Sequence, residues 1–418
     1  MRYLKVSILI GILVSFALAG LYEAGLFQAV DKPFAEFLGY PAPSFHLDFA
    51  LQYTLLAVFA IGIAWTSIDI SSPLLKSIIA AGAMTEVLGA TGIAHIHGIF
   101  FSPFCSLTAI ATSFGIGLAY SRTEAGRRKQ LVQELFGARI SRRTSNALIN
   151  SHAALQFSAQ KCEASVLVCE IFNHALLSSA LPVADYVAMN NAFLANAADY
   201  LVERGGYLEE GQGETLRVIF GAPLADSRHA ITACEAALGL ISRLDAVNDE
   251  CATLWQQRFD YRIGINSGDV IVATYGSQRL AHVSVSGEPV EFARRLCRVN
   301  TIYGSHLLIG AATFAHAERF MEVRPMEIIE RHPENHSQEE IYEVLCLRNQ
   351  LSESERQRRD DFWKAMILYR QRLWNDSLTL LHQIQLDSAN DGPVEFYIRR
   401  IQQLVVGLPE LEVNPSRL

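Results

Sequence analysis

The sequence has few features of a nucleic-acid-binding, disulfide-stabilised or zinc-binding protein. Its 418 residues include 35 Lys and Arg against 43 Asp and Glu, a formal net charge of −8. Binding to nucleic acid needs a basic surface, so this balance excludes nucleic acid as a main partner. The seven cysteines are scattered and form no Cys-x-x-Cys pair, which argues against a disulfide framework or a zinc site. They are Cys105, Cys162, Cys169, Cys234, Cys251, Cys297 and Cys346.

Charge is also scarce in residues 1–120, where long apolar segments take its place. Four segments reach the ~20 residues that a helix needs to cross a bilayer. They span residues 6–26, 49–68, 78–96 and 99–120. We therefore predict a transmembrane region of four helices over residues 1–120.

Lys and Arg flank these segments unevenly. Arg2 and Lys5 precede the first segment, and Arg122, Arg127, Arg128 and Lys129 follow the last. By the positive-inside rule both termini face the cytoplasm, which agrees with an even number of crossings. The prediction is an integral protein of the inner (cytoplasmic) membrane. Its outward loop, around residues 31–48, is predicted to be broken by Pro33, Pro41 and Pro43.

Two features of this region have alternative interpretations. Ala17-Leu18-Ala19 resembles a cleavage site, so the first segment is either an uncleaved anchor, which the later spans favour, or a signal peptide. Glu86 lies inside the third predicted span, where a carboxylate is costly. It either forms a hydrogen bond within the helix bundle or senses a proton or a ligand.

Residues 121–155 form a charged linker with a helical period. Leu131, Leu135 and Ile140 recur on one face. This pattern predicts a juxtamembrane helix that pairs with its twin in a second copy of the chain.

Residues 156–348 alternate predicted strands and helices. Strands are predicted at 164–171, 216–220, 261–265, 270–274 and 283–286, and helices at 184–203, 229–244 and 289–299. Asn266-Ser267-Gly268 is predicted to be the turn of a hairpin. This mixture predicts an α+β domain, in which helices pack on one sheet.

Short motifs in this segment occur in the order and spacing of a known family. The first group is Gly205-Gly206, Gly213-Glu214 and Phe220-Gly221-Ala222-Pro223. The second is Arg262-Ile263-Gly264-Ile265, Ser267-Gly268, Gly287 and Ala293-Arg294-Arg295-Leu296, followed by Tyr303-Gly304. Together they make residues 156–348 resemble the class III adenylate and guanylate cyclases.

This resemblance implies a fold, a reaction and a partner. The fold is a ferredoxin-type sheet with helices. The reaction converts a nucleoside triphosphate, ATP or GTP, to a cyclic nucleotide and pyrophosphate. Two divalent cations, Mg²⁺ or Mn²⁺, activate the ribose hydroxyl and clamp the phosphates. The site is shared between two chains, so the resemblance implies a homodimer, or a heterodimer with another cyclase chain.

The family pattern carries over residue by residue, with departures. The two metal-ligand positions hold Glu170 and Glu214, each one methylene longer than the usual Asp, and a ~1 Å misplacement can lower a rate ~100-fold. The purine-reading positions hold Glu210, which resembles the guanylate type, and Ser284, which does not decide between purines. The transition-state Arg is retained as Arg295. The transition-state Asn is replaced by Glu291, an anion beside the phosphates.

Each of these residues also has a structural interpretation. Glu170 and Glu214 are alternatively solvated strand ends, and Glu210 is alternatively surface charge beside Glu209. Glu291 alternatively pairs with Arg294 or Arg295 along the helix and closes the pocket. His229 is interpreted as a packing or capping residue.

Residues 352–404 are predicted to be helical and resemble one tetratricopeptide-type hairpin with a following helix. Such a unit must pack on the preceding domain or on a partner.

The whole chain is then a membrane-anchored cyclase or a degenerate cyclase homologue that dimerises and regulates. A membrane sensor or transporter is the weakest hypothesis. A diguanylate cyclase is excluded, because Tyr207-Leu208 follows Gly205-Gly206 in place of its signature.

Overall fold

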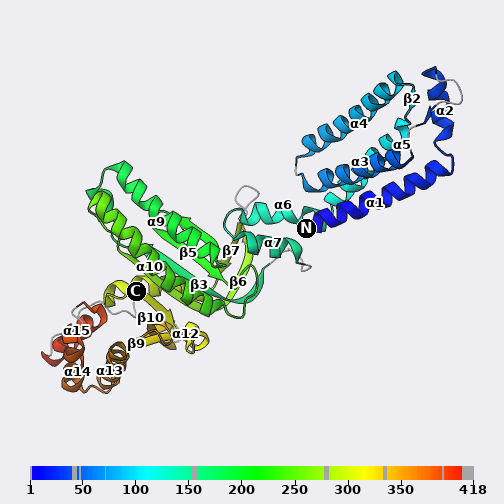
Figure 1. Ribbon diagram of the computed structural model, residues 1–418. Helices are drawn as coiled ribbons and strands as arrows, with labels where there is room; N and C mark the ends of the chain where they lie inside the picture. Colours follow the sequence, from blue (N-terminus) through cyan, green and yellow to red (C-terminus); the bar gives the residue numbers. More distant parts are fainter. Residues whose placement is uncertain are drawn as a thin grey trace. The chain divides into compact units, whose positions relative to one another are not determined.

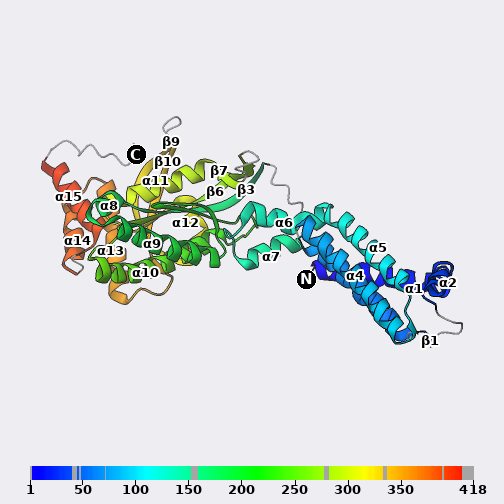
Figure 2. The ribbon, with the colours of Figure 1, turned by 90° about the horizontal axis from the view of Figure 1, so that it is seen from above.

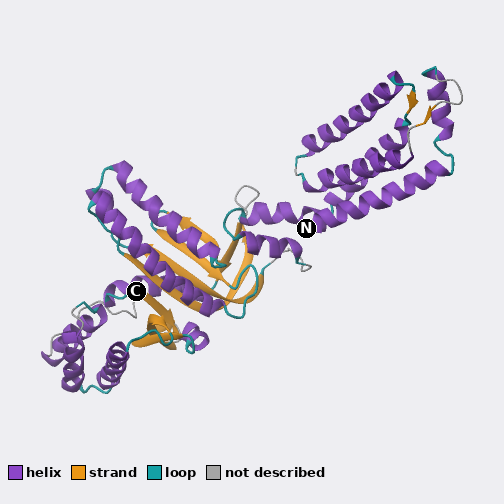
Figure 3. Cartoon of the chain, in the orientation of Figure 1, coloured by secondary structure: helices purple, strands orange, loops and turns teal. Residues whose placement is uncertain are grey.

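The computed structural model describes residues 2–39, 45–46, 49–70, 72–151, 159–276, 282–332, 337–387 and 390–406. Two compact units divide the chain (Figure 1). The helical unit comprises Met1–Glu134 with Ile149–His152, and the sheet unit comprises Leu135–Leu148 with Ala153–Leu418. Figure 3 shows the long strands gathered in the sheet unit.

The helical unit contains the predicted spans. Its helices are α1 (Arg2–Glu23), α2 (Gln28–Phe37), α3 (Phe49–Asp69), α4 (Pro73–Ile96) and α5 (Pro103–Ser121), and the short strands β1 (Phe45–His46) and β2 (Ile99–Phe100) pair in parallel. Helices α1, α3, α4 and α5 are long and apolar enough to cross a membrane. Large apolar side chains point off the unit, such as Phe16 at 82% exposure and Ile96 at 79%. An outer surface of this kind suits lipid rather than water.

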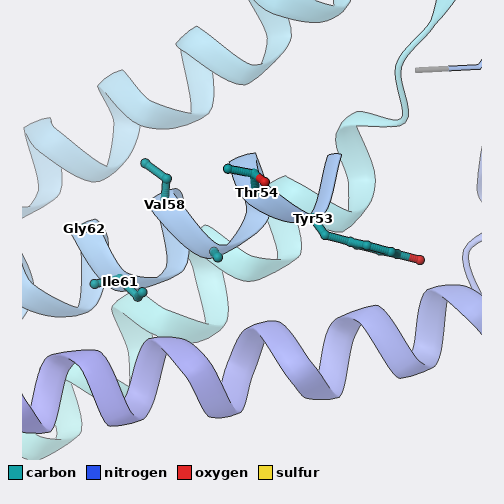
Figure 4. Close-up of a pocket in the computed structure, with 6 residues that line it drawn as sticks. Tyr53, Thr54, Val58, Ile61 and Gly62 are labelled. Atoms are coloured by element: carbon teal, nitrogen blue, oxygen red, sulfur yellow. The ribbon is translucent and has the colours of Figure 1, made fainter. Parts of the chain in front are cut away.

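An open groove runs along α3. Its lining residues are Tyr53, Thr54, Ala57, Val58, Ile61 and Gly62 (Figure 4). The groove is mainly apolar, and the Tyr53 hydroxyl is engaged by Glu23. It therefore offers no catalytic chemistry.

One prediction for the outward loop is wrong. Pro33 does not break structure, because it lies inside α2. Past this proline the helix continues to Phe37, and the N–H of its C-cap residue Leu38 bonds the carbonyl of Phe34. Pro41 and Pro43 lie outside the described residues.

Glu86 points away from the other helices. Its side chain is exposed on α4, and it has no hydrogen bond or ion pair among the described residues. The interpretation of Glu86 as a hydrogen-bonding residue inside the bundle is therefore wrong for the single chain.

The linker forms two helices, α6 (Glu124–Phe136) and α7 (Arg142–Asn150). At its start, the Lys129 ammonium lies 2.7 Å from Asp69, and the Tyr3 hydroxyl donates to the Ala125 carbonyl at 3.0 Å. At its end, Phe136 is buried against Tyr207 with ring centroids 5.2 Å apart.

The sheet unit is built on eight strands in the order β4-β5-β3-β6-β8-β10-β9, with β7 paired to β6. The strands are β3 (Gln160–Ile171), β4 (Tyr207–Gln212), β5 (Thr215–Phe220), β6 (Tyr261–Tyr275), β7 (His282–Ser286), β8 (Leu307–Gly310), β9 (Met321–His332) and β10 (Ser337–Leu347). The helices are α8 (His174–Ala180), α9 (Val183–Glu203), α10 (His229–Trp255), α11 (Glu288–Tyr303) and α12 (Ala311–Ala317). This is the α+β fold that the sequence predicts.

Helices cover both faces of the sheet (Figure 2), and side-chain alternation along the strands separates two cores. Leu167 and Cys169 of β3 face α9 and α10, in a core that also contains Phe193 and Leu240. The other face is covered by α11, which approaches so closely that a side chain at Gly264 would clash with the α11 backbone. Glu170, between two residues of the first core, therefore faces the α11 side.

The predicted hairpin at Asn266-Ser267-Gly268 is absent. β6 runs through these residues as one strand, in register with β3 from Tyr261 to Val272. Ser267 is fully buried, and its hydroxyl bonds those of Ser165 at 2.6 Å and Thr313 at 2.9 Å. These residues resemble a turn in sequence, but they lie inside the sheet, where the Ser267 hydroxyl has partners and the buried Asn266 amide forms no hydrogen bond with a described residue.

The tail forms three helices, α13 (Glu353–Arg370), α14 (Trp374–Asp387) and α15 (Gly392–Val406), as predicted. Ser352 and Glu355 form a capping box that starts α13. The tail packs on α11 and on strands β8–β10 in a second core. Gly304, at φ +70°, ends α11 where the Gly392 backbone approaches, and a side chain at either glycine would clash.

Candidate active site

Two carboxylates lie at neighbouring strand ends. Glu170, near the end of β3, is paired in register with Thr215, the first residue of β5. Glu214 occupies the preceding turn, where its carbonyl accepts a hydrogen bond from the Ile171 N–H at 2.9 Å. Glu170 and Glu214 are therefore brought together, as the cyclase resemblance implies.

Both carboxylates are available to a cation. Glu170 has no hydrogen bond or ion pair among the described residues. Glu214 is 37% exposed, and His174 Nε2 lies 4.0 Å from its Oε1. Hard oxygen donors of this kind fit Mg²⁺ or Mn²⁺. Among the described residues no group of three or more His, Cys, Asp or Glu could by itself hold a metal ion, so phosphate and water would supply the remaining ligands.

The second part of the site joins β4, β5 and β7. Ser284 on β7 donates its hydroxyl to Glu209, the neighbour of Glu210. A register irregularity between Leu208 and Glu210 allows both acidic side chains to reach the same guanidinium. That guanidinium belongs to Arg217 on β5, which contacts Glu209 through Nε and lies 3.1 Å from Glu210 through Nη2. Structure thus places Glu209, and not Glu210, against Ser284.

Burial differs sharply within this cluster. The Glu209 side chain is 2% exposed, Arg217 is 14% exposed and Glu210 is 40% exposed. Burial acts to lower the pKa of the guanidinium, but the hydrogen bond to Glu209 and the nearby carboxylates raise the pKa of Arg217. Glu291 is among these carboxylates, so it lies within electrostatic reach of Arg217.

Arg217 and the metal-ligand position Glu170 lie on the same face of the sheet. Arg217 is paired in register with Val168, and Thr215 with Glu170, so Arg217 and Glu170 project from the same face. The opposite residues of β5, Leu216 and Val218, lie in the first core. The Arg217 cluster and Glu170 therefore belong to one surface.

Helix α11 carries the two transition-state positions. Glu291 is 72% exposed and pairs with Arg294 at 3.2 Å, one of the alternatives that the sequence left open. Burial lowers the pKa of Arg295, and the charge of Glu330 acts in the opposite direction. His229 begins α10 and bonds Ser165 at 2.8 Å, and burial lowers its pKa, so it is a packing residue of the core.

Sequence reasoning missed Glu209 and Arg217. Arg217 is a charged residue inside the apolar run of β5, and that break in the pattern was a usable signal. Glu209 gave no signal of its own, because only the irregular register of β4 turns it inward.

Residues 158–302 match the sequence model described as the adenylate and guanylate cyclase catalytic domain. These residues form a class III cyclase domain. The matched range contains Glu170, Glu214, Arg217, Ser284 and Arg295.

The cyclase domain also has curated relatives. Adenylate cyclase 1 of Rhizobium meliloti (strain 1021) is 26% identical over 169 residues, which is 40% of this chain and 25% of that protein. An uncharacterized protein of Mycobacterium tuberculosis (strain ATCC 25618 / H37Rv) is 27% identical over 190 residues, 46% of this chain and 32% of that protein. The chain thus spans about a quarter to a third of the length of these relatives.

Solved structures resemble the same domain. The guanylyl cyclase Cya2 is 22% identical, with a TM-score of 0.42, over 46% of this chain and 97% of that chain. The adenylyl cyclase CyaB from P. aeruginosa is 20% identical, with a TM-score of 0.42, over 47% of this chain and 100% of that chain.

Proposed function

We propose that the chain is a membrane-anchored class III nucleotide cyclase, which converts ATP or GTP to a cyclic 3′,5′ nucleotide and pyrophosphate. The observation that carries the proposal is the adjacency of Glu170 and Glu214 at the ends of β3 and β5, with no ion pair at the Glu170 carboxylate among the described residues. Two such carboxylates in a cyclase domain are suited to hold the divalent cations of the reaction.

In this proposal different residues bind the cations, stabilise the phosphate charge and contact the base. Glu170 and Glu214 hold the cations, which when bound lower the pKa of the ribose hydroxyl and neutralise phosphate charge. Arg295 stabilises the phosphate charge that builds up in the transition state. Glu210 and Ser284 lie on the base side of the site, where Glu209 holds Ser284. Following the family, the site is completed by a second copy, so the active form is a homodimer.

The helical unit anchors this enzyme in the inner membrane. Arg2 and Lys5 at one end, and the basic run that begins at Arg122 after the last span, favour cytoplasmic termini. The cyclase domain then lies in the compartment that holds ATP and GTP.

A degenerate, regulatory cyclase homologue is the second candidate. The observation that favours it is the Glu291–Arg294 pair on α11. An anion replaces the neutral amide beside the phosphates, and its charge opposes binding of a polyanion.

An assay for cyclic-nucleotide formation distinguishes the active cyclase from the regulatory homologue. Purified full-length chain in lipid nanodiscs is supplied with Mn²⁺ and either ATP or GTP, and cyclic product is quantified by mass spectrometry. Mn²⁺ is the permissive cation for longer carboxylates. We expect cyclic product from at least one nucleotide. Its absence with both nucleotides removes the enzyme proposal and leaves the regulatory one.

Glu291→Asn should raise turnover by ~5-fold, because it removes an anion that opposes the phosphates with ~1 kcal/mol in water-like surroundings. The effect is modest because Glu291 is largely exposed. The measurement is kcat for cyclic product. Glu288→Gln, on the same helix but paired with Arg331, is the matched control and should leave kcat unchanged. A fall in kcat for Glu291→Asn would show that the position is assigned wrongly.

A further inference from the structure

We propose that the outer face of α4 is a docking surface for a membrane-spanning helix of another protein, and that this helix carries a Lys or Arg opposite Glu86. The outer face is the side of α4 that bears Gly82, Glu86, Gly89 and Ile93. The inference rests on the membrane anchoring proposed above and is independent of the cyclase reaction.

α4 is the least covered of the four candidate spans, and it lies at an edge of the helical unit (Figure 1). Only 17% of its apolar stretch is buried, against 22%, 39% and 33% in the other three spans. Its buried residues are Lys76, Ala80, Val87 and Thr91. Residues 82, 86, 89 and 93 recur at a spacing of three or four, so they share the opposite, exposed face.

Glu86 lies deep in this span. It is the fourteenth of the 24 residues of α4, so at 1.5 Å per residue it is about 20 Å from Pro73 and about 15 Å from Ile96 along the helix axis. The short carboxylate side chain cannot reach water over these distances. An ionisable side chain at this depth is costly in lipid and requires a partner.

The single chain does not supply that partner. Glu86 has no hydrogen bond or ion pair among the described residues. The hydroxyl of the adjacent Thr85 donates to the carbonyls of Ala81 and Gly82, at 2.7 and 2.9 Å. Lys76 is the only Lys or Arg of α4, and it lies ten residues away on the buried face.

A second copy of the chain does not supply a cation either. In a symmetric contact through α4, the residue at the depth of Glu86 is the other Glu86, which carries a like charge. Lys5 and Lys76 are the only Lys or Arg residues in the four spans, and both lie within four residues of a span start. A complementary charge at the depth of Glu86 therefore comes from a different protein.

The outer face leaves room for a helix to approach closely. A Cβ added at Gly82 or Gly89 would have no described atom of another residue within 4 Å. Ile78 and Ile93 lie on either side of Glu86 along the helix, at 56% and 62% exposure, and offer apolar contact. The partner that fits is an apolar span with one Lys or Arg near its middle.

Synthetic single-span probes test the surface. Full-length chain and a fluorescent probe peptide are combined in liposomes, and their association is measured by energy transfer. One probe is a run of about 20 Leu and Ala residues with a central Lys, and the other has Leu at that position. We expect the Lys probe to associate about 10-fold more tightly, the size of one polar contact between helices in a membrane.

Glu86→Gln should abolish this preference, because the amide keeps the size of the side chain and removes its charge. Glu36→Gln is the matched control, since it changes an exposed carboxylate of α2 outside the four spans, and it should keep the preference. Gly89→Ile adds a branched side chain to the outer face and should weaken the Lys probe by about 10-fold. Gly20→Ile, at an equally open position of α1, should not weaken it.

Three results overturn the proposal. Equal association of the Lys and Leu probes shows that lipid covers α4. A preference that survives Glu86→Gln places the binding site elsewhere. Self-association of the chain that Glu86→Gln abolishes, without binding of the Lys probe, makes a second copy the occupant.

The membrane anchoring is checked separately, by washing the liposomes at alkaline pH. If the wash removes the chain, the membrane anchoring and this inference fail together, and cyclic-nucleotide formation still decides the cyclase function. If the chain stays in the liposomes and the Lys probe shows no preference, the anchoring stands and only the docking surface is removed.

Discussion

Glu170→Gln should lower cyclic-nucleotide formation by ~100-fold or more, because it removes the charge of a metal ligand while keeping its size. Glu170 is suited to this role by position: it faces the α11 side of the sheet, next to the turn that carries Glu214. Its carboxylate has no partner among the described residues, so the substitution breaks no contact in the fold. The loss should therefore appear in kcat and in the Mn²⁺ concentration at half-maximal rate, and not in the thermal unfolding temperature.

The same strand offers a matched control. Glu163 lies on β3 with Glu170, and its carboxylate is 54% exposed beside His316. Glu163→Gln makes the same chemical change away from the site, and turnover should not change. Equal rates for Glu170→Gln and Glu163→Gln would contradict the metal-ligand assignment. Glu170→Asp adds a second readout, because a restored side-chain length should improve turnover with the more demanding Mg²⁺.

Local sequence signals predicted elements whose stability is local. The apolar spans, the helix that starts at His229 and the capped helix of the tail all begin at or near the predicted residues. The end of α10 was not predictable in this way. It continues to Trp255 because Asn248 binds both the N–H and the carbonyl of Phe259 at 3.0 Å, a contact between segments that no periodicity reveals.

The residues of the candidate site also fall into those that a sequence pattern predicts and those that only the structure reveals. The adjacency of Glu170 and Glu214 follows from the family pattern, because that pattern specifies which strands are neighbours. The identity of the inward carboxylate on β4 does not, since Glu209 and Glu210 are equivalent in sequence and only the irregular pairing distinguishes them. Arg217 supplies the positive charge of this cluster. Its role could not be predicted from the sequence, because that role depends on the burial of Glu209.

A buried charge cluster joins the tail to the sheet. Arg324 on β9 is 9% exposed, and its Nε lies 2.6 Å from Glu343 of β10. Its other two nitrogens bind both carboxylate oxygens of Asp391, between α14 and α15, at 2.7 and 2.9 Å. Burial acts to lower the pKa of Arg324, but these two carboxylates raise it. Burial raises the pKa of Glu343, against the opposing charge of Arg324.

Arg324→Met should destabilise the sheet unit by about 3–5 kcal/mol, because it leaves the buried Glu343 without its cation. The measurement is thermal unfolding of the full chain. Since the folded-state pKa of an uncompensated Glu343 rises further above its unfolded value, the loss should grow as the pH rises through that pKa and shrink in acid. Adding Glu343→Gln should recover part of the stability, because it removes the uncompensated charge.

An exposed ion pair of the tail is the control for the Arg324→Met prediction. Arg356 pairs with Glu353 on the surface of α13, where Arg356→Met should change stability by no more than about 0.5 kcal/mol. A similar small effect for Arg324→Met would mean that the apolar core alone holds the tail on α11. A large effect at Arg324 alone links the tail to the helix that carries Glu291 and Arg295, because both pack in the same core. The tail is then a structural part of the cyclase unit, and loosening it should lower turnover together with stability.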